Sequence, residues 1–123
     1  MQIFLAEDNE DNVFIVKTNL KKIYPDAELI RAADGQEAVE MLEGGTLNPA
    51  IFLVDIAMPR LDGLGFVKWL KEQTTYKDIP AIAVTASVFA EMKESYIQHG
   101  FDMILEKPFT RKDLAAILDK ALN

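Results

Sequence analysis

The stretch AIFLVDIAMPRLDG, residues 50–63, decides the fold class of this chain. Its first part is an apolar run with β-branched and aromatic residues, which is typical of a strand covered on both faces. The run ends on a carboxylate, Asp55, and a turn containing Pro59 and Gly63 follows. Because an unpaired buried carboxylate is costly, we expect either a compensating group near Asp55 or a chemical role for it.

Composition places the chain among small globular proteins. Its 123 residues fit one domain, 1–123, and the 50% hydrophobic content is enough to build a core. With 13 basic and 20 acidic residues the net charge is −7, which argues against direct binding to nucleic acid or to an anionic membrane. The absence of cysteine excludes disulfide and thiolate chemistry, and no signal peptide or spanning segment is evident. We therefore expect a cytoplasmic location.

Strand-like and helix-like segments alternate along the chain. The strand-like segments are residues 2–6, 27–32, 50–55, 81–86 and 102–106. The helix-like segments are residues 9–24, 34–44, the stretch after Gly63, 89–100 and 110–121. This alternation predicts an α/β fold with a five-stranded parallel sheet and helices on both faces. We expect the doubly wound, flavodoxin-like (βα)5 arrangement with strand order 2-1-3-4-5.

Periodicity and capping residues predict how the helices sit. Asp34, with Glu37 three residues on, and Thr110, with Asp113, are typical of helix N-termini. The residues expected to face the core are Val13, Val16, Leu20 and Ile23 in the first helix, Phe89, Met92 and Tyr96 in the fourth, and Leu114, Ile117, Leu118 and Ala121 in the fifth.

Polar residues stand at the ends of four predicted strands. Glu7 and Asp8 follow the first strand, Asp55 ends the third, Thr85 lies in the fourth and Lys107 follows the fifth. The carboxyl ends of parallel strands share one edge, where ligands bind in doubly wound sheets. Three carboxylates there would repel one another and raise one another's pKa, and a hard cation such as Mg²⁺ would relieve the conflict. Lys107 and Thr85 could then hold phosphoryl oxygens while Asp55 acts as the nucleophile.

Four motifs, together covering these positions, carry a family resemblance. They are LAEDNEDN at residues 5–12, LVDIAMPRLDGL at 53–64, AVTAS at 83–87 and EKPFT at 106–110. In this order and spacing they resemble the receiver domain of two-component response regulators, the family of the bacterial chemotaxis regulator. The resemblance covers essentially the whole chain.

The resemblance implies a phosphoacceptor and a metal site. Asp55 would accept a phosphoryl group from a phosphohistidine on a histidine kinase or a histidine phosphotransfer protein. Asp8 and Asp55 would bind Mg²⁺, for which Mn²⁺ could substitute, with Glu7 acting through water and Ala57 through its backbone carbonyl. Lys107 would pair with the acceptor and then with the phosphate.

The resemblance also implies a conformational switch. Thr85 would swing toward the phosphoryl oxygen and reposition the loop that follows, and the Lys107–Pro108 bond is typically cis in the family. The switch position that often holds an aromatic ring is Ile104 here, so signal transfer would depend on Thr85, residues 86–89 or the fourth helix. We expect the face made by the fourth helix, fifth strand and fifth helix to bind a downstream protein.

Other readings of the chain remain open at this point. A small aspartate-nucleophile phosphatase would call for a second acid at Ala57, and a flavin module would call for a phosphate-cradling loop in place of EDNEDN. A pseudo-receiver would lack the full polar set. Met1 favours a free-standing protein, whereas the end at Asn123 also fits a module cut from a hybrid kinase or larger regulator.

Overall fold

The computed structural model describes residues 1–86 and 90–123, and it confirms the predicted fold class. The strands are β1 (Gln2–Ala6), β2 (Glu28–Ala32), β3 (Pro49–Asp55), β4 (Ala81–Thr85) and β5 (Met103–Glu106). The helices are α1 (Glu10–Ile23), α2 (Gly35–Glu43), α3 (Gly63–Glu72), α4 (Ala90–His99) and α5 (Arg111–Leu122). All strand pairs are parallel, and the sheet order is β2-β1-β3-β4-β5.

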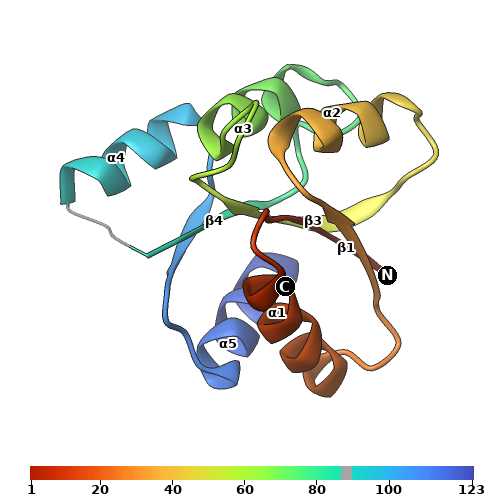
Figure 1. The fold of residues 1–123 in the computed structure, drawn as a ribbon, viewed down its shortest axis with the longest axis vertical. Coiled ribbons are helices and arrows are strands. Elements are labelled where there is room, and N and C mark those ends of the chain that lie inside the picture. The colour runs from red at the N-terminus through yellow and green to blue at the C-terminus, as the bar shows by residue number, and fades with distance from the viewer. Residues whose placement is uncertain (87–89) are drawn as a thin grey trace.

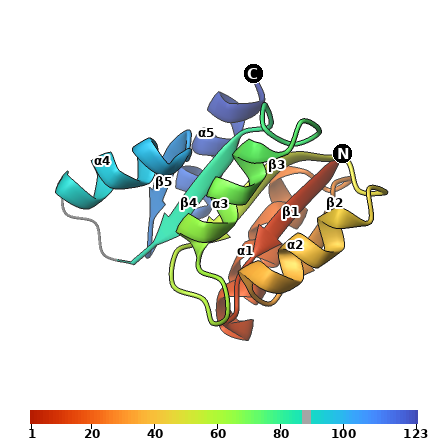
Figure 2. The ribbon, with the colours of Figure 1, turned by 90° about the horizontal axis from the view of Figure 1, so that it is seen from above.

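The sheet lies between two layers of helices. Figure 1 shows α1 and α5 on one side of the sheet and α2, α3 and α4 on the other, and Figure 2 shows the same layers from above. Alternation along β1 divides the core accordingly. Ile3 and Leu5 pack toward α1 and α5, whereas Phe4 and Ala6 pack toward the opposite layer. Both faces of the central strands are therefore apolar, as the opening stretch predicts.

Local capping residues begin the helices where the sequence places them. The Asp34 side chain accepts a hydrogen bond from the Glu37 backbone N–H at 2.8 Å. Thr110 and Asp113 form a reciprocal capping box at the start of α5. Asp62 caps α3 through the Gly65 N–H at 2.8 Å. These bonds satisfy backbone donors that a helix leaves free, so the boundaries follow from short-range sequence.

The prediction for α4 is wrong at one position. Tyr96 is buried as expected, but Met92 is 37% exposed. The start of α4 projects beyond the edge of the sheet, so a residue in its first turns has no apolar layer to pack on (Figure 1). Phe89, predicted to face the core with them, lies outside the described residues.

Candidate functional site

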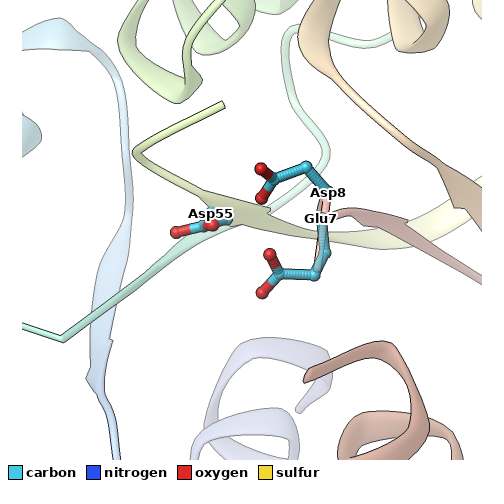
Figure 3. Close-up of side chains that lie close together, drawn as sticks. All are labelled: Glu7, Asp8 and Asp55. Atoms are coloured by element: carbon cyan, nitrogen blue, oxygen red, sulfur yellow. The ribbon is translucent and has the colours of Figure 1, made fainter. Parts of the chain in front are cut away.

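Three carboxylates gather at the carboxyl edge of the sheet. Glu7 and Asp8 directly follow β1, and Asp55 ends β3, the neighbouring strand. One carboxylate oxygen from each lies within 4.8 Å of the others, and Figure 3 shows the three side chains in one place. The edge lies where the strand order changes direction, which is the ligand-binding position of doubly wound sheets.

The three acids differ in their exposure to solvent. Glu7 is 2% exposed and Asp55 is 8% exposed, whereas Asp8 is open to solvent. Burial, and then the neighbouring Asp55 carboxyl, raise the pKa of Glu7 above its ordinary value, while the Lys107 ammonium acts in the opposite direction. The site therefore concentrates negative charge that one lysine only partly balances.

Lys107 lies between the two buried acids. Its Nζ is 3.0 Å from Glu7 Oε1 and 3.6 Å from Asp55 Oδ1, so its shorter contact is with Glu7. The Lys107 backbone N–H donates to the Thr85 carbonyl at 2.8 Å, and the Lys107–Pro108 bond is cis, as the resemblance implies. β5 and its following loop thus carry the ammonium group back to the acids of β1 and β3.

The remaining predicted residues lie around this cluster. Thr85 is buried at the end of β4, the strand next to Asp55, while Ala57 is exposed in the loop after β3. Ile104 is half-buried and packs against the core on the α2, α3 and α4 side. The fold brings Glu7, Asp8, Asp55, Thr85 and Lys107 to the same edge. The residues after Ala86 that the switch would involve, 87–89, lie outside the described part.

A tight return of the chain holds the loop after β3. The Gly63 backbone N–H donates to the Ile56 carbonyl at 2.9 Å, which closes the loop on itself. A Cβ at Gly63 would collide with the backbone carbonyl of Asp55. Glycine is therefore required where α3 begins, because any side chain there would displace the residue that ends β3.

Two groups of residues near the site escape the sequence analysis. A cavity of about 420 Å³ adjoins the acids, and Ile15 and Phe109 line part of its apolar wall. Phe14, next to Ile15 on α1, is 69% exposed. The helical period that turns Val13 and Val16 inward also predicts that Phe14 and Ile15 point outward, so the sequence held this signal. The second group is a pair of arginines, Arg31 and Arg60, whose contacts only the folded chain creates.

The chemistry of the cluster fits a hard divalent cation. Its donors are all carboxylate oxygens, from Glu7, Asp8 and Asp55, and Asp8 keeps one side open to solvent. Mg²⁺ prefers oxygen ligands, keeps several waters and binds through one or two carboxylates together with phosphate. Because the acidic cluster is open to solvent on one side, a bound Mg²⁺ could keep several of its waters there.

Comparison with known proteins identifies the family. A model of the response regulator receiver domain matches residues 3–119. The chain belongs to the response regulator receiver domain family. Receiver domains serve two-component signalling, both in separate response regulators and as modules of sensor kinases. They are phosphoacceptors that bind Mg²⁺ at an acidic site, and the acidic cluster of this receiver domain lies at the corresponding edge of the sheet.

Individual relatives show both kinds of context. This receiver domain is 28% identical over 98% of its length to the sensor histidine kinase CheAY of Helicobacter pylori, of which it spans 15%. It is 32% identical to the polar-differentiation response regulator DivK of Brucella ovis, over 88% of this chain and 85% of DivK. A crystal structure of the receiver domain of a Pseudomonas aeruginosa sensor histidine kinase, with magnesium in its active site cleft, superposes with a TM-score of 0.87 at 30% identity over 98% of this chain and 96% of that one.

Within residues 1–86 and 90–123, every helix is too short or too polar to cross a bilayer.

Proposed function

We propose that this receiver domain is a conformational switch that takes a phosphoryl group onto Asp55 from a phosphohistidine donor. The observation that carries the proposal is the convergence of Asp55, two further acids and the Lys107 ammonium at one edge of the sheet. A structural role alone leaves this concentration of charge unexplained, because grouped carboxylates repel one another.

The reaction requires one bond to form and one to break. An Asp55 carboxylate oxygen attacks the phosphorus atom, and the phosphorus–nitrogen bond to the donor imidazole breaks. Its electron pair stays on the imidazole nitrogen. The product is an acyl phosphate on Asp55. Lys107 Nζ, 3.6 Å from Asp55 Oδ1, is close enough to stabilise negative charge on the transferred group, and Thr85 at the next strand end can donate a hydrogen bond to it.

The acids would hold a magnesium ion, with Mn²⁺ as a substitute. Asp8 and Asp55 are the proposed direct ligands, Glu7 acts through water and Ala57 offers its backbone carbonyl. The ion supplies neutralisation of charge on the phosphoryl oxygens when bound. The same three acids without a cation would repel an incoming phosphate, so metal dependence is part of the proposal. The proposed chemistry is limited to slow self-phosphorylation and self-dephosphorylation at Asp55, with no turnover of a metabolic substrate.

The donor would be a histidine kinase or a histidine phosphotransfer protein that approaches over α1. Support comes from Ile15, which lines the cavity beside the acids and is 46% exposed, and from its neighbour on α1, Phe14, which is 69% exposed. A donor histidine must come within bonding distance of Asp55, so the surface around that opening must contact the donor. Exposed apolar side chains at such a place mark an interaction surface.

The output surface would be the face of α4, β5 and α5. Thr85 connects to it directly, because its carbonyl accepts the Lys107 N–H at the end of β5. Lys93 of α4 and Glu106 of β5 form an ion pair of 2.9 Å across the same face. A movement of Thr85 toward a phosphoryl group would therefore be transmitted to β5.

Intact-mass measurement after incubation with acetyl phosphate and Mg²⁺ tests the proposal. We expect one added phosphoryl group, which is absent when EDTA replaces Mg²⁺ and absent in Asp55→Asn. Asp62→Asn is the matched control, because Asp62 is an acid of the following loop whose capping role asparagine can retain. Phosphorylation of the control at the wild-type level is expected.

Three results would contradict parts of the proposal. Unmodified wild-type protein under these conditions would remove the phosphoacceptor function. Turnover of phosphomonoesters without a stable adduct would favour a phosphatase instead. Unchanged partner binding and phosphorylation after substitutions on the α4, β5 and α5 face would count against that surface as the output.

A further inference from the structure

Arg31 occupies an unusual place at the end of β2. In the sheet register it lies beside Leu5, and Leu29, two residues earlier on the same strand face, packs against the core under α1. A guanidinium therefore stands where the alternation of the strand predicts an apolar side chain. Its side chain is 25% exposed and reaches over the carboxyl edge of the sheet to the loop between β1 and α1.

Arg31 donates two hydrogen bonds to that loop and one to Glu10, the first residue of α1. Nε donates to the Glu7 carbonyl at 3.0 Å, and Nη2 to the Asp8 carbonyl at 3.4 Å. Nη1 donates to Glu10 Oε1 at 2.9 Å. Because the Glu10 side chain is 81% exposed, that ion pair adds little by itself. The two backbone carbonyls belong to residues whose side chains form the acidic cluster.

Within the described residues, one backbone hydrogen bond connects this loop to the sheet after β1 ends. In this bond the Glu7 N–H donates to the Ala32 carbonyl of β2 at 3.0 Å. After that bond the chain turns away toward Asn9, which caps α1. Arg31 adds two further hydrogen bonds between β2 and this loop, to the backbone carbonyls of Glu7 and Asp8. These are the residues whose carboxylates lie near Asp55.

We propose that Arg31 is a positioning residue for the cation site, which holds the backbone of Glu7 and Asp8 so that their carboxylates face Asp55. This inference rests on the proposed function, since it presumes that the acids bind Mg²⁺. Groups that orient metal ligands without touching the metal typically change affinity by about 10- to 100-fold.

The positive charge of Arg31 and its positioning of the loop have opposite effects on Mg²⁺ affinity. A cation near the site repels Mg²⁺, so loss of the guanidinium charge alone would tighten Mg²⁺ binding. Loss of the tether would weaken binding, because the two acids would spend less time in the required arrangement. The sign of the change in Mg²⁺ affinity therefore separates the two roles.

Titration calorimetry of Mg²⁺ into the unphosphorylated protein provides the test. We expect Arg31→Ala to raise the Mg²⁺ dissociation constant about 10-fold. Arg31→Lys keeps the charge but has no planar fork to span two carbonyls, so we expect a weakening of several-fold. Arg111→Ala is the matched control, an exposed arginine on α5, and is expected to bind as the wild type does.

Each other outcome contradicts a definite claim. Tighter or unchanged Mg²⁺ binding by a folded Arg31→Ala protein would overturn the positioning role, even if the melting temperature in EDTA falls. If Arg31→Ala does not fold, the Arg31→Lys affinity decides, and wild-type affinity in that variant would overturn the role as well. A wild-type protein that binds no Mg²⁺ would instead overturn the proposed function.

Discussion

At the scale of single residues, Asp34 links two segments that are far apart in the sequence. One carboxylate oxygen accepts the Glu37 N–H of α2, and the other accepts Arg60 Nε at 2.9 Å. Arg60, in the loop after β3, has a left-handed backbone with φ of 65°. The Gly35 N–H also donates to the Leu61 carbonyl at 3.0 Å. Asp34 therefore helps to fasten the loop that follows the acceptor to the start of α2.

This double contact predicts a pH-dependent stability. The Arg60 guanidinium first, and the Glu37 N–H second, lower the pKa of Asp34 below its usual 3.8. A lowered folded-state pKa adds stability above pH 3.8, which is lost as the pH falls through the folded-state value. Asp34→Asn keeps a cap acceptor but loses the ion pair, so we expect a smaller free energy of unfolding than wild type at pH 7. The gap should close below pH 3.8 in urea titrations.

Asp34→Ala serves as the companion variant, since it also removes the cap. We expect it to lose about 1 kcal/mol more than Asp34→Asn at pH 7. A gap between wild type and Asp34→Asn that stays constant from pH 7 to acid pH would contradict the role of the ionised carboxylate.

At the scale of elements, α5 combines a local start signal with a buried face. The Asp113 N–H donates to Thr110 Oγ1 at 3.1 Å, and the Thr110 N–H donates to Asp113 Oδ2 at 2.9 Å. Leu114 and Leu118 are fully buried against the sheet. The capping box sets where α5 begins, and the apolar face sets how it packs, so the preceding loop, which contains Lys107, is fixed where it enters α5.

The cap has a measurable contribution to stability. We expect Thr110→Ala to lower the free energy of unfolding by about 1 kcal/mol, because the Asp113 N–H loses its acceptor, Thr110 Oγ1. Thr110→Ser should retain most of the stability. Thr18→Ala, at an exposed position within α1, is the matched control and should be neutral or slightly stabilising. Chemical denaturation measures all three, and equal losses in Thr18→Ala and Thr110→Ala would contradict the cap.

At the scale of the whole molecule, the site exists only when the sheet is complete. Its acids and its lysine come from chain segments around residues 7, 55 and 107, which three different strands carry to one edge. Loss of any of these strands from the sheet separates the charges. A cation that binds the folded site, and not the unfolded chain, must therefore stabilise the entire domain.

Thermal unfolding can measure this coupling. We expect Mg²⁺ at 100 times its dissociation constant to add about 2.7 kcal/mol to the free energy of unfolding, with reversal by EDTA. Asp8→Asn should lose most of the Mg²⁺-dependent rise in melting temperature, since a cluster acid becomes neutral. Asp11→Asn, an exposed acid in the first turn of α1, should keep the full rise. Equal Mg²⁺ responses in the two variants would show that the ion acts through general charge screening.

The sequence by itself determined the fold class and which side chains meet at the site. Apolar strands such as residues 50–55, alternating with capped amphipathic helices, leave few topologies, and parallel strands bring Asp8, Asp55 and Lys107 to one edge by geometry. These inferences rest on local periodicity and on a rule about parallel sheets, so they needed no coordinates.

Only the tertiary structure decided those contacts between distant segments that the hydrophobic periodicity of the sequence does not predict. The tethers of Arg31 and Arg60, the shorter contact of Lys107 with Glu7 and the exposure of Met92 all depend on where long side chains and a helix end come to lie. A flexible charged side chain can reach several acceptors of similar energy, and hydrophobic periodicity carries no information on which one the packed chain brings within hydrogen-bond distance.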